Sequence, residues 1–413
     1  MTITTTYLIT VFIIVSVVSY TIYIKNIVNP LFLFVIPTGV AYILYVLYFQ
    51  ATWTLSNEAN LIFLIGEFSY LIGYFFSCFF NSLVKSVATK TVLISYQDVH
   101  FEKNIIVWVF LVSGIIMNFL SIIKLRQLGA GSDSFRDQFI IIVSSLPPYV
   151  IYGKYITVFA LCSLLYSYLT SKISRWYLLI ILLGTGIVYY SATLTQARTD
   201  ILIILMPLAI IFLMVKIQNA NWQLFVKSVF IVIFCLLLLY FSFLFVQIAR
   251  FGNNTGNFFS SENQTFQYIS LPLTAFDRWM VTPNLSGIRH GFGIIDPIDK
   301  FLKLFQINQY EYSFAVRGQF NVYSYLSAPF LALGKFGVFF VMVIAGYFNY
   351  WLFNKAKYST YYLLYYAFFE NSVMLSFYSW QMTSMVNLYA LMFILLVQSN
   401  RVKVHESKLN NKL

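Results

Sequence analysis

The sequence predicts an all-α protein that crosses a membrane several times. Hydrophobic residues make up 60% of the 413 residues and charged residues only 10%, and the mean hydropathy is +0.77. A soluble protein cannot bury that much apolar surface. The apolar residues form separate runs of about 20 residues, the length that a helix needs to cross about 30 Å of hydrocarbon. Composition and run length therefore predict a polytopic helical bundle.

About eleven spans are predicted, to within one. The first run has no Lys or Arg before it and no small-residue cleavage pattern after it, so we expect a first span rather than a removable signal peptide. The runs are 4–24, 30–49, 59–80, 104–123, 149–170, 176–195, 199–217, 227–248, 335–353, 358–377 and 384–399.

Basic residues collect on alternate connections between these runs. The positive-inside rule makes that side cytoplasmic and places the C-terminal tail there. The opposite connections 50–58 and 378–384 carry no Lys or Arg. The cytoplasmic set is Lys25, Lys85, Lys90, Lys103, Lys172, Arg175, Lys216, Lys227, Lys355, Lys357, Arg401, Lys403, Lys408 and Lys412.

We divide the chain into three segments. Residues 1–249 hold eight spans with an external loop at 124–148, residues 250–334 form a large external loop, and residues 335–413 hold three spans and a basic cytoplasmic tail. In the large loop, scattered prolines favour several short helices joined by turns, with a partial helix over 319–332. The loop interleaves arginines and acidic residues; its members include Arg250, Asp277, Arg278, Arg289, His290 and Arg317.

Arginines also stand in two other outer segments. Arg198 lies in the tight turn Thr195–Asp200, where Thr199 or Asp200 is expected to cap the next helix. Arg198 then either binds an anion at that helix N-terminus or anchors in the lipid headgroups. Loop 124–148 is predicted to carry a short surface helix, which either braces the interface or holds Arg126 and Arg136 over the outer mouth of the bundle.

Four ionisable residues fall inside predicted spans. A charge near the bilayer centre costs about 2.5–3.5 kcal/mol, so each should face a partner or a wet cavity. Lys154 and Lys335 lie near the outer ends, where they can reach the surface, whereas Glu67 and Glu370 lie deeper. These acids fit either proton coupling or a buried pair that locks helices together.

Cofactor chemistry has little support in the sequence. Cys78, Cys162 and Cys235 fall within apolar runs, which implies neither a disulfide framework nor a thiolate metal site. Of the three histidines only His290 lies on the outer side, so we expect no cofactor and a metal-independent protein. A carboxylate magnesium site stays an alternative. The net charge of +12 reflects membrane topology, and no nucleic-acid partner is expected.

The outer arginines indicate a phosphate ligand. A guanidinium presents a planar fork that matches phosphate oxygens, and it can balance a pyrophosphate without a divalent metal. Arginines close to membrane depth therefore favour a lipid pyrophosphate. Many aromatic residues accompany them in the large loop, where they either stack on sugar rings or belt the interface.

The layout resembles that of the Wzy-type O-antigen and capsule repeat-unit polymerases. The likeness lies in the outer turn Gln196-Ala-Arg198-Thr-Asp200, the long outer Arg/Asp/His loop, and Leu333-Gly-Lys-Phe-Gly337 at the start of a late span. It implies a membrane glycosyltransferase with a GT-C-like fold, related to O-antigen ligases and SEDS polymerases. It also implies that the donor and acceptor glycans are linked to undecaprenyl diphosphate and that membrane lipids surround the protein. The reaction would then take place at the outer face of the bacterial inner membrane. Whether a chain-length regulator protein binds is left open.

This reading assigns roles to individual residues. Arg198, Arg278 and Arg289 are expected to stabilise the leaving pyrophosphate, with Arg250, Arg317, Arg126 and Arg136 as supporting substrate-binding residues. His290 or Asp277 is expected to act as the base for the acceptor hydroxyl, or else to stabilise the loop. The alternatives are an O-antigen ligase, which shares the donor, and a flippase for lipid-linked oligosaccharides. The clustering of charges in one outer loop, with no internal repeat, favours the polymerase over transport and over a scaffold role.

Overall fold

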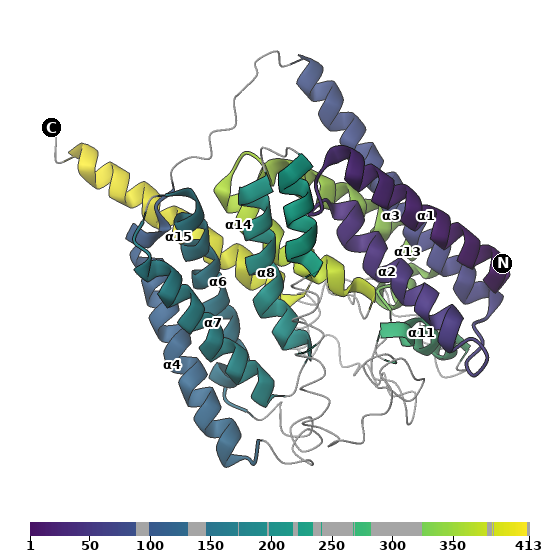
Figure 1. Cartoon of the computed structure of the whole chain (residues 1–413), viewed down its shortest axis with the longest axis horizontal. Coiled ribbons are helices and arrows are strands. Elements are labelled where there is room, and N and C mark those ends of the chain that lie inside the picture. Colours follow the sequence, from purple (N-terminus) through teal and green to yellow (C-terminus); the bar gives the residue numbers. More distant parts are fainter. Residues whose placement is uncertain are drawn as a thin grey trace. The chain divides into compact units, whose positions relative to one another are not determined.

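The protein is helical throughout the part of the chain that the computed structural model describes, and no β-strand occurs there (Figure 1). The described residues are 1–87, 99–130, 146–171, 173–195, 198–217, 222–233, 241, 267, 269–281, 324–377, 382 and 384–410.

Most of the helices cover predicted apolar runs. The helices are α1 (Ile3–Ile24), α2 (Pro30–Tyr48), α3 (Asn57–Val87), α4 (Ile105–Gln127), α6 (Pro148–Thr170), α7 (Trp176–Leu194), α8 (Arg198–Ile217), α11 (Pro272–Val281), α13 (Ser327–Ala356), α14 (Thr360–Met374) and α15 (Met385–Asn410), with short 3₁₀ turns η1 (Phe101–Lys103) and η5 (Leu375–Phe377). Helix α11 lies in the predicted large loop, and α13 and α15 extend beyond their runs. A further apolar helix covers Trp222–Ile233. The run predicted at 227–248 lies only in part within the described residues.

Six helices in the described part of the chain are long and apolar enough to span a membrane. They lie at Ile3–Ile24, Pro30–Tyr48, Asn57–Leu83, Ile105–Gln127, Trp176–Leu194 and Ala332–Ala356. Many of their large apolar side chains are exposed, among them Phe12, Ile72 and Phe340. Because lipid tails rather than water solvate such faces, the protein is a multi-pass membrane protein.

Local sequence explains the helix ends. The Asn29 side chain accepts the Phe32 N–H at 3.1 Å and so caps α2, whose first residue is Pro30. At the end of α1, Lys25 adopts a left-handed conformation (φ 52°) and donates its N–H to Ile22. Helix α13 breaks at Leu333 and Gly334, where Gly334 has φ 61° and ψ −143°. The break falls where the sequence predicted that a partial helix gives way to a span.

The chain forms two compact units that interleave along the sequence. The first unit comprises Met1–Leu93, Gly256–Lys355 and Ser372–Leu388. The second unit comprises Ile94–Thr255, Ala356–Asn371 and Tyr389–Leu413. Each unit therefore draws on both halves of the chain.

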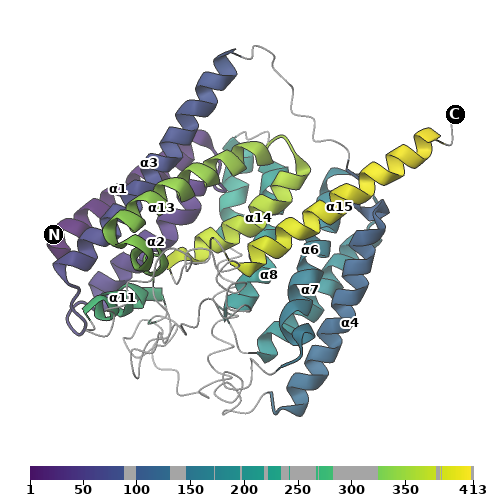
Figure 2. The same cartoon turned by 180° about the vertical axis from the view of Figure 1, so that it is seen from behind.

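In the first unit, α1, α2, α3 and α13 run side by side, and α11 lies at the end of this bundle where the chain begins (Figures 1 and 2). Glycines bring α3 and α13 into backbone contact: a Cβ at Gly73 would lie 1.9 Å from the Val343 carbonyl oxygen, and one at Gly346 would lie 2.1 Å from that of Tyr70. Small residues at such crossings are typical of membrane helices. Next to the crossing, Asn349 donates to the Tyr70 hydroxyl at 2.6 Å.

We expect Gly346→Ala to destabilise the protein by about 1–3 kcal/mol, since the added methyl group would force two backbones apart. The measurement is the thermal unfolding midpoint of the purified protein in detergent. Gly186→Ala in α7 is the matched control, because no atom lies within 4 Å of a Cβ there. Equal midpoints for the two variants would contradict the prediction.

In the second unit, α4 and α6 pack together, and α7 and α8 pack against α6. A Cβ at Gly114 in α4 would lie 2.3 Å from the Thr157 hydroxyl of α6, and Asn118 donates to that same hydroxyl at 3.0 Å. The hydroxyl of Thr360 also donates to the Tyr166 hydroxyl of α6 at 2.8 Å. Helix α6 is therefore the central element of this unit.

Candidate functional site

In the first unit, the candidate site is built on the connection between α2 and α3, whose backbone is fixed by several hydrogen bonds. The Tyr45 hydroxyl donates to the Trp53 carbonyl oxygen at 2.5 Å and accepts the Leu55 N–H at 3.0 Å. The Ser56 hydroxyl accepts the Ala59 N–H at 3.0 Å, which caps α3. These bonds fix residues 53–56 at the end of the bundle that the charge pattern predicts to be outside.

Asp277 anchors α11 to this connection. Its Oδ2 accepts the Ser56 N–H at 2.7 Å and its Oδ1 accepts the Ser56 hydroxyl at 2.5 Å. The residue is 5% exposed, and its carboxylate stands at the positive N-terminal end of α3. Both oxygens are thus engaged in holding α11. This arrangement favours the loop-stabilising role that the sequence left open for Asp277.

Arg278 lies beside it on the exposed face of α11. Its guanidinium carbon is 3.7 Å from the centroid of the Trp53 ring, a cation–π contact. The side chain is exposed. A guanidinium that contacts an aromatic ring is held in place more closely than a freely moving side chain, and it carries a planar fork of N–H donors. Such a fork suits a phosphate or carboxylate ligand.

A second cation meets the same end of α3. Lys335, just after the break in α13, pairs with Glu58 at 2.9 Å, and both side chains are about half exposed, at 46% and 56%. An exposed pair of this kind contributes about 0–1 kcal/mol. Lys335 therefore reaches the surface at the end of its span, in line with its predicted position.

The second unit also carries arginines where helices end. Arg126, in the last turn of α4, donates to the Tyr190 hydroxyl of α7 and lies 5.8 Å from that ring centroid. Beneath it, Leu125 forms a small core with Ala130, Val150 and Leu194. The end of α4, the start of α6 and the end of α7 therefore meet, as the predicted topology requires.

Asp200 and Lys154 form a buried ion pair next to Arg198. Lys154 of α6 contacts the Asp200 carboxylate, and each residue is 8% exposed. Thr195 donates to the same carboxylate at 3.0 Å. Helix α8 begins at Arg198, so Asp200 lies in the first turn and not at the predicted cap position. The pair ties the start of α8, which carries Arg198, to α6.

The two deep acids are both buried. Glu67 of α3 accepts a hydrogen bond from the Tyr325 hydroxyl at 3.0 Å. Burial raises the pKa of Tyr325, which precedes α13, well above its usual range, and the nearby Glu67 raises it further. The tyrosine thus keeps the proton that it donates in this hydrogen bond. Glu370, in α14, belongs to the second unit and is fully buried.

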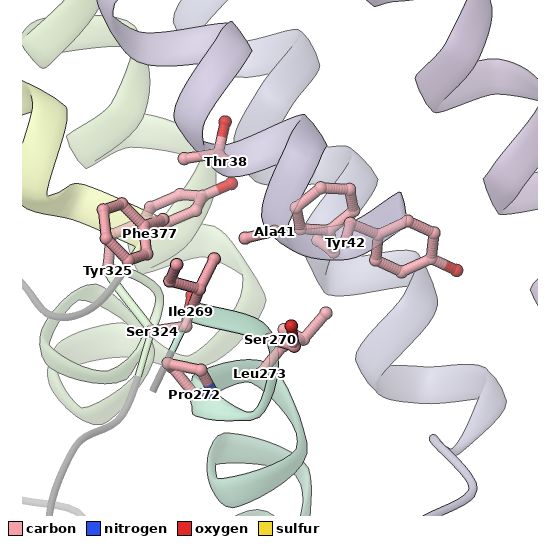
Figure 3. A pocket seen from close by; sticks show the side chains of 11 residues that line it. Thr38, Ala41, Tyr42, Ile269, Ser270, Pro272, Leu273, Ser324, Tyr325 and Phe377 are labelled. Atoms are coloured by element: carbon pink, nitrogen blue, oxygen red, sulfur yellow. The ribbon is translucent and has the colours of Figure 1, made fainter. Parts of the chain in front are cut away.

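A pocket opens between α2, α3, α11 and the start of α13, all within the first unit (Figure 3). Its cavity volume is about 20 Å³, room for about one water molecule. In Figure 3, Thr38, Ala41 and Tyr42 of α2 face Ile269, Ser270 and Leu273 across the space. The described residues that line it are Thr38, Ala41, Tyr42, Phe63, Ile269, Ser270, Pro272, Leu273, Ser324, Tyr325 and Phe377.

The predicted site residues therefore fall into separate groups. Asp277 and Arg278 share α11 in the first unit, while Arg126 and Arg198 belong to the second. The backbone of Arg198 is placed at the first position of α8. The predicted site residues that lie outside the described residues are Arg136, Arg250, Arg289, His290 and Arg317.

Sequence reasoning missed Trp53 and Ser56. The connection 50–58 attracted notice only because it lacks Lys and Arg, yet it provides the contacts of both α11 site residues. One signal was available: a serine just before a long apolar run is a typical helix N-cap. Nothing in the linear sequence pairs Trp53 with Arg278.

Within the described ranges, no group of three or more His, Cys, Asp and Glu side chains is placed to hold a metal ion. The cations at the helix ends that the charge pattern predicts to be outside are suited to binding an anion by direct hydrogen bonds. Comparisons with protein-family models, curated proteins and solved structures find no match to this chain.

Proposed function

We propose that this protein polymerises lipid-diphosphate-linked oligosaccharide repeat units at the outer face of the bacterial cytoplasmic membrane. The observation that carries the proposal is Arg278, an exposed guanidinium whose carbon lies 3.7 Å from the centroid of the Trp53 ring, at a helix end predicted to face outward. A stacked arginine at membrane depth fits a pyrophosphate whose lipid tail stays in the bilayer. The proposal includes eleven spans, a GT-C-like fold and a cytoplasmic C-terminus.

In the proposed reaction, a hydroxyl oxygen of the acceptor glycan attacks the anomeric carbon of the donor glycan. The bond from that carbon to the diphosphate oxygen breaks, and the electron pair leaves with undecaprenyl diphosphate. The acceptor hydroxyl proton passes to a base, for which we propose His290. Pyrophosphate is already a good leaving group, so the main task of the protein is to stabilise the developing negative charge.

The arginines share this task in the proposal. Arg278, Arg198 and Arg289 contact the leaving diphosphate, and Arg126, Arg136, Arg250 and Arg317 hold the lipid-linked substrates. Asp277 acts as a positioning residue: its two hydrogen bonds to Ser56 hold α11 so that Arg278 lies over Trp53. No metal ion or cofactor takes part.

The test is to delete the gene and resolve the surface glycan by length on a gel. We expect single repeat units on the lipid core with no ladder above them. Loss of all surface glycan would contradict a polymerase. In that case, lipid-linked polymer outside the membrane would indicate a ligase, and lipid-linked single units trapped inside would indicate a flippase.

Complementation with point variants tests the site. We expect Arg289→Ala and Arg198→Ala to give no ladder while their membrane levels match the wild type, because each removes a charge that stabilises the leaving group. Lys216→Ala, on the predicted cytoplasmic side, is the control and should restore the ladder. Normal long-chain glycan from both arginine variants would refute the site assignment.

A further inference from the structure

Glu67 of α3 is a carboxyl group buried within a predicted span. It is 2% exposed, and it lies ten residues after the first residue of α3, or roughly 15 Å along the helix. A buried carboxylate without a cation is unfavourable, and such a group becomes neutral by keeping its proton. None of the ion pairs among the described residues includes Glu67; these pairs are His100–Glu102, Lys154–Asp200 and Lys335–Glu58.

Two hydroxyl groups face this carboxyl group. Tyr325 donates to Glu67 Oε1 at 3.0 Å, and the Thr38 hydroxyl of α2 lies within hydrogen-bonding reach of the same carboxyl group. The single hydroxyl proton of Thr38 is donated to the Phe34 carbonyl oxygen at 2.8 Å. The Thr38 oxygen can therefore accept a hydrogen bond, and a protonated Glu67 supplies the proton that such a bond needs.

The structure around Tyr325 holds its hydroxyl at the carboxyl group. A Cβ at Gly66 would lie 2.8 Å from the Tyr325 hydroxyl oxygen, so the missing side chain in α3 makes room for it. The Tyr325 ring packs edge-on against Phe34, at 5.3 Å between ring centroids, and the Tyr325 N–H donates to the Ser376 carbonyl oxygen at 3.1 Å. The contact with Glu67 is therefore fixed from several sides.

The cavity beside Tyr325 has room for about one water molecule. Its volume is about 20 Å³, and Thr38, Ser270 and Tyr325 are among its lining residues (Figure 3). Ser270 is 2% exposed, and its hydroxyl has no hydrogen-bond partner among the described residues. A water molecule would satisfy Ser270 and would also donate to the Tyr325 oxygen, which is able to accept because Tyr325 gives its own proton to Glu67.

From these observations we propose that Glu67 is a buried proton-binding site, whose proton holds α2, α3 and the segment before α13 together and exchanges through the water in the cavity. In the protonated form, Glu67 accepts from Tyr325 and donates to Thr38, so both neighbours bond to one neutral group. Loss of the proton leaves a buried negative charge that no cation among the described residues balances, and this weakens the contact.

The exchange is a transfer along one chain of hydrogen bonds. Glu67 passes its proton to the Tyr325 oxygen while Tyr325 passes its own proton to the water molecule. The products are a carboxylate and a hydronium ion, and the reverse step restores the neutral acid. No glycan or diphosphate takes part, so this site goes beyond the proposed polymerisation.

Infrared spectroscopy of the full-length protein in lipid nanodiscs at neutral pH tests the charge of Glu67. A protonated carboxyl group and a carboxylate absorb at well-separated frequencies, and subtraction of a variant spectrum cancels the other acids. We expect wild type minus Glu67→Gln to contain a carboxylic acid band. Glu58→Gln is the matched control, because Glu58 is an exposed residue of the same helix that pairs with Lys335; its difference spectrum should contain only carboxylate bands.

Two results would overturn the proton site. Carboxylate bands in place of the acid band in the Glu67→Gln difference would mean that Glu67 is ionised. If Glu67→Gln does not fold, Tyr325→Phe is measured instead. It removes one hydrogen bond to the carboxyl group and should move the acid band to higher frequency, and acid bands that stay in place would contradict the assignment.

Transfer of the protein into D₂O tests the role of the cavity water. Deuterium lowers the frequency of the acid band, so the rate of this change measures exchange at Glu67. We expect Ala41→Val, whose added methyl groups fill the cavity, to slow the exchange several-fold. Ala345→Val is the matched control, because Ala345 is 8% exposed like Ala41 and belongs to the same unit but does not line the cavity. Equal exchange rates in the two variants would refute the route through the cavity.

These outcomes are separable from the proposed function. Both infrared measurements report on the protonation of Glu67 and do not depend on polymer formation. If gene deletion leaves the glycan ladder intact but the acid band is present, Glu67 is a proton site in a protein of another activity. If deletion removes the ladder and Glu67 is ionised, the polymerase stands and the proton site fails.

Discussion

Replacing Arg278 by alanine is expected to reduce polymerisation by about 10²–10³-fold, the usual effect of removing one donor that stabilises a developing negative charge. Arg278→Lys keeps the charge but lacks the planar fork that lies 3.7 Å over Trp53, so we expect it to recover only a small part of the activity. The measurement is the rate of polymer formation from lipid-linked repeat units in proteoliposomes.

The matched control for Arg278→Ala is Lys335→Ala. Lys335 is another exposed cation at the same end of the first unit, where it pairs with Glu58. The proposal gives it no contact with the diphosphate, so its removal should leave the rate close to that of the wild type. Both variants should keep the wild-type unfolding midpoint, because each side chain is exposed. A polymerisation rate for Arg278→Ala equal to that of Lys335→Ala would remove Arg278 from the site.

Breaking the Lys154–Asp200 pair is expected to have the largest effect on stability. Asp200→Asn leaves the Lys154 ammonium buried without its counter-ion, and removing one partner of a buried pair typically costs about 3–5 kcal/mol. The Asp200 carboxylate also accepts from Thr195, so the start of α8 should loosen with it. The measurement is the unfolding midpoint in detergent.

Two comparisons make this prediction specific. Glu58→Gln breaks the half-exposed pair with Lys335 and should cost no more than about 1 kcal/mol. The double variant Lys154→Met with Asp200→Leu removes both buried charges and should recover most of the lost stability. If the double variant is as unstable as Asp200→Asn, the loss does not arise from the unpaired lysine.

Arg198 connects this ion pair to the proposed reaction. It is the first residue of α8, and Asp200 lies in the same turn. We therefore expect the double variant Lys154→Met with Asp200→Leu to recover more of the wild-type stability than of the wild-type polymerisation rate. In this variant, apolar contacts would hold α8 without the directional bonds of Asp200. Comparing the two measurements separates folding from the positioning of Arg198.

The sequence by itself determined the class of the protein and the positions of its helices. Long apolar runs can satisfy their backbone hydrogen bonds in lipid only as helices, so the runs at 4–24, 30–49 and 176–195 predicted α1, α2 and α7 to within a residue or two. Glycine and its neighbours also located the break in α13, because Gly334 adopts a left-handed φ that other residues avoid.

Only the tertiary structure decided which side chains meet. Asp277 lies 221 residues from Ser56, and Glu67 lies 258 residues from Tyr325. No periodicity in the chain encodes such pairs, because they follow from how helices of similar hydropathy pack against one another. Asp277, one of the two candidate bases in the sequence, thus lies where its hydrogen bonds to Ser56 anchor α11. The pocket beside Ser270 likewise arose from five separate segments of the chain.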